Sequence, residues 1–245
     1  MARQNIYDDP EFFAGYRNLR DHLVALHENV IQPMLPVLVP DLDGRRVVDL
    51  GCGEGFFCRL ARSQGATHVI GIDPSEKMLA VARERTSDDE IAYVQAFAED
   101  AEVEEGTAEV VVSILALHYV ADFDGVVSAV HGWLVSGGRF VLIVEHPVAT
   151  APDQSEGYTM EGDTEVAWLL THYFKEGSRE QEWYIPGVIK YHRKIDTMVN
   201  SLIDRGFVIE RLSEPSPTAE VAAEYPRSRG DSIRPGVLGI RARKP

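Results

Sequence analysis

The glycines and acids in the first third of the chain have the spacing of a ligand-binding turn. The segment VVDLGCGEG places three glycines in the pattern G-x-G-x-G: Gly51, Gly53 and Gly55. Glycine permits a sharp turn and a close approach of the backbone to a ligand. Asp49 precedes the turn, and Asp73 follows Gly53 by twenty residues, at the end of a second apolar segment. An acid at that position can accept hydrogen bonds from ribose hydroxyls.

The glycine spacing distinguishes between adenosine-containing ligands. The dinucleotide pattern G-x-G-x-x-G/A requires a small last residue, because the helix packs closely on the strand and faces the pyrophosphate. Phe56 occupies that position, which makes an NAD-linked oxidoreductase the less favoured enzyme class. A ligand with a ribose at one end and an ammonium at the other suits Asp49 and Asp73, and S-adenosylmethionine has both groups. The structural alternative is a tight turn without a ligand.

The elements that must position these residues alternate between strands and helices. Apolar segments predict strands near 46–50, 68–72, 91–96, 108–114 and 139–145, with helices near 54–64, 75–85 and 123–134. A helix over 196–205 with Gly206 as its C-cap precedes strands over 207–212 and 237–243. Near the N-terminus, Asp9 and Pro10 predict the start of a helix. A second helical stretch near 20–35 is expected to end at Pro33 and Pro36.

Together these segments resemble the class I S-adenosylmethionine-dependent methyltransferases, in particular their small-molecule, methyltransferase type 11-like branch. VVDLGCGEG is similar to the family's glycine motif, and GIDPSEKML is similar to its ribose-binding acid and following helix. LALHYV and GGRFVLIVEHP resemble the stretches around the fourth and fifth strands, and YDDPEFFAGY resembles the branch's opening segment. The resemblance implies an α/β fold with a Rossmann-like seven-stranded sheet. That sheet is mostly parallel, with an antiparallel edge hairpin and helices on both faces.

The resemblance also implies a single methyltransferase domain over residues 1–245, with residues 1–40 as an N-terminal helical lid. Residues 147–190 interrupt the alternation, and we expect this insertion to cover the substrate pocket at the carboxyl ends of the strands. Family members often have an acid at the position of Phe97, which could here pack on the adenine and leave its amino group to the backbone or Glu99. The predicted cofactor-binding residues are Tyr7, Tyr16, Arg20, Asp49, Gly51, Cys52, Gly53, Asp73, Pro74, Met78, Ala98, Glu99 and Ile114.

Three residues after the fourth and fifth strands are candidates for catalysis. Methyl transfer from a sulfonium is an in-line displacement, so alignment of the reacting atoms supplies much of the rate. A base is needed only where the acceptor must lose its proton early. His118 is either a base or substrate contact, or a histidine that holds its loop. Glu145 and His146 either orient the acceptor or form a structural acid–histidine pair.

Composition disfavours several other functions. The 245 residues include 39 Asp and Glu but 24 Lys and Arg, a formal net charge of −15, whereas nucleic-acid binders normally present a basic face. The spacing of Cys52 and Cys58 suggests neither a disulfide framework nor a metal site. Neither a signal segment nor an apolar stretch of membrane-spanning length is visible, so we expect a cytoplasmic protein.

The sequence therefore predicts an S-adenosylmethionine-dependent methyltransferase that acts on an O or N atom of a small-molecule metabolite, either neutral or cationic. Two alternatives stay open. A protein of this fold could use the bound cofactor as a non-transferring electrostatic element, or it could be a cofactor-binding regulatory protein. The aromatic and histidine residues near the predicted ligand edge favour catalysis over regulation.

Overall fold

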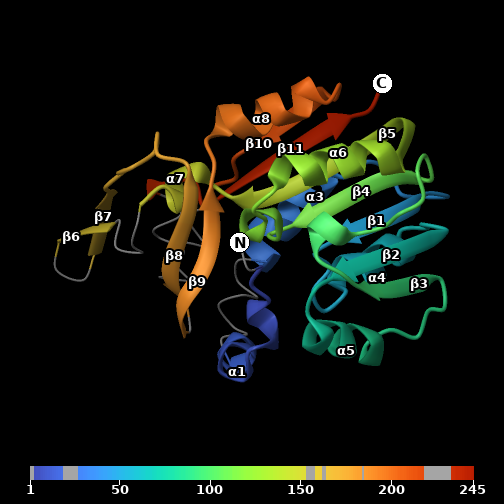
Figure 1. The fold of residues 1–245 in the computed structure, drawn as a ribbon, viewed down its shortest axis with the longest axis horizontal. Helices are drawn as coiled ribbons and strands as arrows, with labels where there is room; N and C mark the ends of the chain where they lie inside the picture. The colour runs from blue at the N-terminus through green and yellow to red at the C-terminus, as the bar shows by residue number, and fades with distance from the viewer. Residues whose placement is uncertain (1–2, 19–26, 153–157, 162–163, 184, 218–232) are drawn as a thin grey trace.

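A seven-stranded sheet organises the described residues, which in this computed structural model are 3–18, 27–152, 158–161, 164–183, 185–217 and 233–245. Its strands are β1 (Arg46–Leu50), β2 (His68–Asp73), β3 (Ile91–Gln95), β4 (Ala108–Ile114), β5 (Leu134–Glu145), β10 (Val208–Ser213) and β11 (Val237–Arg243). Their order is β10-β11-β5-β4-β1-β2-β3 (Figure 1). Strands β1 to β5 are parallel, whereas β11 runs antiparallel to β5 and β10. The predicted fold class, including its antiparallel edge hairpin, is confirmed.

The central strands supply two hydrophobic cores, one on each face of the sheet. In β4, Val111 joins the core beneath α6 (Phe123–Trp133) and α8 (Ile195–Asp204). Its neighbours Val110 and Val112 join the core of the other face, which is covered by α3 (Gln32–Leu38), α4 (Phe56–Ser63) and α5 (Glu76–Glu84). Successive side chains of a strand point to opposite faces, so a strand covered on both sides becomes apolar throughout. Helices therefore cover both faces, as predicted.

The first helix begins where its capping residues predict. In α1 (Pro10–Asn18), Asp9 Oδ1 accepts hydrogen bonds from the backbone N–H groups of Glu11 and Phe12, each 2.9 Å long. Proline fits the first position of a helix because its missing N–H would have no partner there. Phe12 is fully buried, so this cap also holds an aromatic anchor of the N-terminal segment.

The predicted end of the next helical stretch is wrong. A π-helical turn (His27–Ile31) leads into α3, which continues through Pro33 and Pro36 to Leu38. Pro33 lies in the first turn of α3, where the absent N–H is tolerated. Pro36 removes an N–H donor from the helix, but Leu35 and Leu38 are buried in the core around it. Burial of such side chains contributes about 1.5–3 kcal/mol each, which offsets the lost hydrogen bond.

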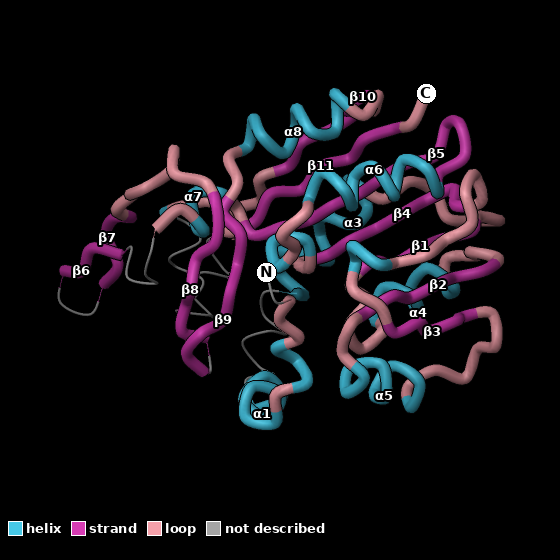
Figure 2. The backbone as a smooth tube through the Cα atoms, viewed as in Figure 1, coloured by secondary structure: helices cyan, strands magenta, loops and turns pink. Residues whose placement is uncertain are grey.

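Two hairpins and a short helix follow β5. They comprise α7 (Pro147–Thr150), β6 (Tyr158–Glu161), β7 (Thr164–Trp168), β8 (Gly177–Trp183) and β9 (Ile185–His192). Strand β6 pairs with β7 and β8 pairs with β9, each antiparallel. Figure 2 shows the N-terminal segment between the β8–β9 hairpin and the central strands of the sheet. Gln4 joins the N-terminal segment to the β8–β9 hairpin, because its side-chain amide donates to Gly187 O and accepts from the N–H of Ile189.

Three-residue 3₁₀ helices connect the remaining elements at Ile6–Asp8, Ala98–Asp100 and Leu117–Tyr119. Within the described residues, no helix combines the length and the apolar character needed to cross a bilayer.

Candidate active site

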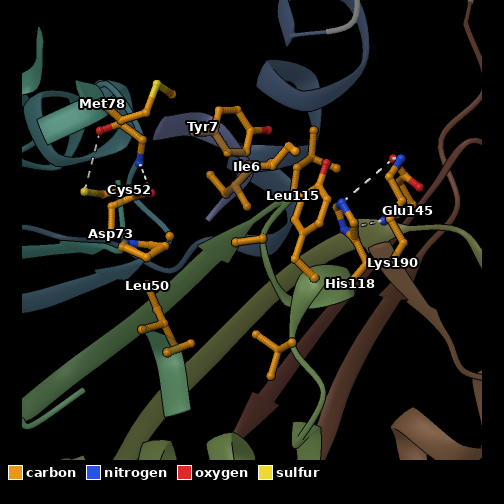
Figure 3. Close-up of a pocket in the computed structure, with 18 of the residues that line it drawn as sticks. Ile6, Tyr7, Leu50, Cys52, Asp73, Met78, Leu115, His118, Glu145 and Lys190 are labelled. Atoms are coloured by element: carbon orange, nitrogen blue, oxygen red, sulfur yellow. Dashed lines mark hydrogen bonds and ion pairs between the residues drawn. The ribbon is translucent and has the colours of Figure 1, made fainter. Parts of the chain in front are cut away.

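A cavity of about 1240 Å³ lies at the carboxyl ends of the parallel strands. Small-molecule pockets are commonly about 300–1,000 Å³, so this volume accommodates a nucleoside cofactor together with a second small ligand. One end, here called the turn end, is lined by Asp49, Gly51, Cys52, Gly53 and Asp73. The other, called the ion-pair end, is lined by His118, Glu145 and Lys190. Figure 3 shows the two ends on opposite sides of Ile6, Tyr7 and Leu115.

The backbone of the turn end depends on glycine. Gly51, Gly53 and Gly55 have φ angles of +84°, +51° and +72°, a region that other residues rarely adopt. A Cβ atom on Gly51 would lie 2.2 Å from Cβ of Ala116, which is too close for either atom. The turn is tied to the next strand because the N–H of Gly51 donates to Ile72 O over 2.7 Å. The backbone of Gly51 and Gly53 therefore lines the cavity with no side chain in between.

Asp73 is held by backbone donors at the end of β2. Its Oδ2 accepts from the N–H of Gly53 and its Oδ1 from the N–H of Ser75, both over 2.9 Å. Burial, with 8% of Asp73 exposed, raises the pKa of its carboxyl group to about 6 despite these donors. These two hydrogen bonds fix the carboxylate against the glycine turn. Its remaining lone pairs can accept hydrogen bonds from a ligand in the cavity, which Asp73 lines.

Asp49 lies deeper, at the end of β1. It is 2% exposed, and Cys58 Sγ lies 3.3 Å from its Oδ2. Burial raises the pKa of Asp49 to about 7, with a hydrogen bond from Cys58 acting in the opposite direction. Burial disfavours the ionised carboxylate, whereas a nearby cation favours it. The turn end is therefore suited to a ligand that brings positive charge.

The N-terminal segment closes over the turn end through Asp8. This carboxylate accepts from Ser75 Oγ over 2.6 Å and from the N–H groups of Glu76 and Lys77 at the start of α5. Asn5 Nδ2 donates to Pro74 O over 3.0 Å. Asn5 Oδ1 is buried and has no hydrogen-bond partner among the described residues. An orphaned acceptor beside the cavity indicates a place for a ligand donor.

Aromatic side chains line the middle of the cavity. The Tyr7 ring lies 5.3 Å from the Tyr16 ring and 6.3 Å from the Tyr119 ring, in edge-to-face arrangements. Burial raises the pKa of both the Tyr7 and the Tyr119 phenol. Near the third strand, Phe97 lines the cavity with the Arg3 guanidinium 5.4 Å from its ring centroid. Flat surfaces are thus available along the cavity.

The structure brings together the predicted cofactor-binding residues that it describes. These residues all line the cavity: Tyr7, Tyr16, Asp49, Gly51, Cys52, Gly53, Asp73, Pro74, Met78, Ala98, Glu99 and Ile114. Arg20 lies outside the described residues. Asp100, which adjoins Glu99, pairs with Arg3.

A buried ion pair dominates the other end of the cavity. Lys190 Nζ donates to Glu145 Oε1 over 2.6 Å, and His118 Nε2 lies 3.8 Å from the same oxygen. Burial would raise the pKa of Glu145, but Lys190 and His118 outweigh it and lower this pKa to about 2. Burial lowers the pKa of His118 to about 4. The N–H of Glu145 donates to His118 Nδ1 over 3.5 Å, which places the proton of the neutral ring on Nε2.

His146 lies away from this centre, and its placement does not support the predicted catalytic role. It is 1% exposed, and its Nε2 lies 2.7 Å from Glu214 Oε1. Its Nδ1 accepts from the N–H of Val148, which caps the first turn of α7. Adjacent residues at the end of a strand point to opposite sides, so Glu145 faces the cavity and His146 does not. The structural pair of Glu145 with His146, one of the two alternatives left open by the sequence, is replaced by two separate pairs, Glu145 with Lys190 and His146 with Glu214.

Sequence reasoning missed Lys190, although its strand contains a signal. Alternate residues of β9, namely Val188, Lys190 and His192, are buried. A lysine on the buried side of an amphipathic strand must have a partner, because an unpaired buried charge is strongly unfavourable. The pattern was visible, but the partner Glu145 lies 45 residues earlier. Only the fold brings the two together.

Comparisons with known proteins agree with this geometry. The family described as "Methyltransferase domain" matches residues 48–142. An S-adenosylmethionine dependent methyltransferase structure from Mesorhizobium loti is 39% identical with a TM-score of 0.80, covering 86% of this chain and 96% of the other. An uncharacterized protein of Haemophilus influenzae is 34% identical over 98% of this chain and 97% of its own length.

A third relative is named for its reaction. The ubiquinone biosynthesis O-methyltransferase of Pseudomonas aeruginosa is 38% identical over 104 residues, which cover 41% of this chain and 44% of that protein. The chain thus matches less than half the length of that named relative. The similarity to the Mesorhizobium loti structure, which extends over most of both chains, is decisive: the chain belongs to the S-adenosylmethionine-dependent methyltransferases, and its cofactor is S-adenosylmethionine.

Proposed function

We propose that this methyltransferase transfers its methyl group to an O or N atom of a small-molecule acceptor by in-line displacement. The observation that carries the proposal is one cavity that contains both the turn end and a polar, aromatic-walled second end. The N-terminal segment and β9 both line that cavity, so a compact molecule fits it better than a macromolecular chain. The partial similarity to an enzyme named an O-methyltransferase supports oxygen as one of the acceptor atoms.

The residues at the turn end fit the cofactor. Asp73 would accept hydrogen bonds from the ribose hydroxyls, and Asp49 would face the cationic methionine part. A Cβ atom at position 51 would lie only 2.2 Å from Cβ of Ala116. Only glycine therefore fits this turn and leaves its backbone open to a ligand. Asn5 Oδ1, which is buried without a partner in the described part of the chain, would accept a further ligand hydrogen bond. When bound, the cofactor supplies a methyl group that is already activated by its sulfonium.

Catalysis at this site would rest on alignment. A general base works best when its pKa is near the working pH. Glu145, with a pKa of about 2, and His118, with a pKa of about 4, are both poor bases at neutral pH. The protein would therefore position an acceptor that has already lost its proton to water. The lone pair of that acceptor would form the new bond to the methyl carbon while the carbon–sulfur bond to the departing thioether breaks.

Residues 1–245 would act as one domain, in which residues 1–40 form a lid and residues 147–190 cover the acceptor. Gln4 holds the lid to the β8–β9 hairpin, and Asp8 holds it to α5. Such closure would exclude water from the reacting atoms.

Two measurements test the proposal. Isothermal titration should detect binding of S-adenosylmethionine, and Asp73→Ala should weaken it by at least tenfold because both carboxylate oxygens are lost. Incubation of a cell extract with tritiated-methyl cofactor should then label molecules that pass an ultrafiltration membrane and separate from the cofactor by chromatography. Label confined to retained protein or RNA, or no label at all, would contradict a small-molecule acceptor.

A further inference from the structure

The ion-pair end presents an ammonium group to the cavity. The Lys190 side chain is 7% exposed, and its Nζ is 2.6 Å from Glu145 Oε1. The ammonium also lies 4.9 Å from the Trp183 ring centroid and 5.8 Å from the Tyr119 ring centroid. A buried ammonium is unfavourable unless charges or rings compensate for its lost hydration. One carboxylate and two aromatic faces supply that compensation here.

The ammonium has more donors than this environment accepts. A lysine side chain carries three N–H donors. Within the described ranges, Glu145 is the hydrogen-bond acceptor of Lys190, while Trp183 and Tyr119 offer ring faces only. Lys190 itself lines the cavity. At least one N–H is therefore available to an acceptor atom of a ligand.

Two arginines also act on this end of the cavity, and each has partners of its own. Lys190 and Arg234 act on Glu145, while Lys190 and Arg193 act on His118. Arg193 donates to backbone carbonyls at Val120 and Ala121, and the carboxylates of Asp122, Asp124 and Glu176 also act on its charge. The donor available at this end is therefore the Lys190 ammonium, and Glu145 Oε1 is already bonded to it. A cationic acceptor would be repelled, and an anionic one attracted.

We propose that the ion-pair end binds a small aromatic acid, with an anionic oxygen conjugated to a planar ring placed on the Lys190 ammonium. The ring would pack against Tyr7, beside the Tyr119 and Trp183 rings that Lys190 covers. This proposal rests on the proposed function and narrows its acceptor class. It departs from the neutral or cationic metabolite expected from sequence, because Lys190 already occupies the aromatic faces that would attract a cation.

Two probes with the same ring and opposite charge test this inference. The protein is first saturated with S-adenosylhomocysteine and then titrated with benzoate or with benzylamine in the calorimeter at pH 7.5. Benzoate is expected to bind at least tenfold more tightly than benzylamine. Failure of S-adenosylhomocysteine to bind would count against the proposed function. With that step intact, equal or tighter binding of benzylamine, or no benzoate binding at millimolar concentration, would overturn the inference alone.

A neutralised pair provides the matched variant. Lys190→Met combined with Glu145→Gln removes both charges and leaves no unpaired charge buried. It should reduce benzoate affinity at least tenfold while binding S-adenosylhomocysteine normally. Lys194→Met removes a lysine that pairs with Asp196 at the surface and does not line the cavity, so it should change neither affinity. Unchanged benzoate affinity in the double variant would remove Lys190 from the site, and Lys190→Arg, which keeps the cation, should retain the preference for benzoate.

Discussion

Cofactor binding should release a proton from Asp49. In the unliganded protein, burial raises the pKa of Asp49 to about 7 and that of Asp73 to about 6. At pH 6, a large part of both groups is therefore protonated. A cationic ligand beside Asp49 requires its ionised form, so binding must displace the proton. Affinity should consequently fall as the pH is lowered through these values.

The size of the effect follows from the two pKa values. With bound-state pKa values well below 5, Asp49 alone weakens binding about tenfold between pH 8 and pH 6, and Asp73 adds a factor of about two. At pH 6.5, about three-quarters of Asp49 and one-quarter of Asp73 hold a proton, so about one proton leaves per cofactor bound. Calorimetry in buffers of different ionisation enthalpy measures this number directly.

Asp49→Asn is the matched variant for that titration. It keeps the shape of the buried side chain but has no proton to release, so only the factor of about two from Asp73 should remain. Titration of the amino group of the ligand itself is common to both proteins and cancels in the comparison. An affinity that changes less than threefold between pH 8 and pH 6 would refute the reasoning. A tenfold change in the cofactor affinity of the Asp49→Asn variant over the same pH range would also refute it.

Three further predictions concern separate parts of the site. Gly51→Ala should abolish measurable cofactor binding, because its Cβ would lie 2.2 Å from Ala116 Cβ. The control Gly44→Ala, at φ +72° with no atom within 4 Å of the added Cβ, should cost only about 1–2 kcal/mol of stability. Asp8→Ala should lower the free energy of unfolding by about 1–2 kcal/mol through its lost hydrogen bonds, which thermal unfolding would register as about 2–8 °C. The ring of His118, with its pKa lowered to about 4, should show no NMR titration between pH 5.5 and pH 8, and a midpoint near 6.5 would contradict its burial.

The strands were predicted well from the sequence because their apolar residues lie close together along the chain. The apolar residues of β1, β2 and β4 are consecutive in sequence, and burial on both sheet faces requires that composition. The glycine turn was equally readable, because Gly51 and Gly55 adopt φ angles that exclude most other residues. The extension of α3 through Pro36 was not readable. It depends on packing of Leu35 and Leu38 against distant strands, and the local proline signal points the other way.

The second end of the cavity was harder to predict because its charges come from different elements. Glu145 ends β5, Lys190 lies on β9 and His118 lies in a 3₁₀ helix after β4. Sequence reasoning identified the first and third from their positions after strands. It assigned His146 the same role as Glu145 because neighbours in sequence were treated as neighbours in space. The pleat separates them, and Lys190 takes the position beside Glu145 instead.

The N-terminal segment links the two ends of the cavity physically. Asp8 caps α5 two residues beyond Pro74, which adjoins Asp73, while Gln4 is bonded to β9 one residue before Lys190. Between them, Tyr7 contacts Tyr119 in the wall of the ion-pair end. A cofactor that draws Asn5 and Tyr7 onto the turn end therefore also sets the wall against which an acceptor would pack. Because this segment contacts both ends, a ligand that moved it at the turn end would also move the wall of the ion-pair end.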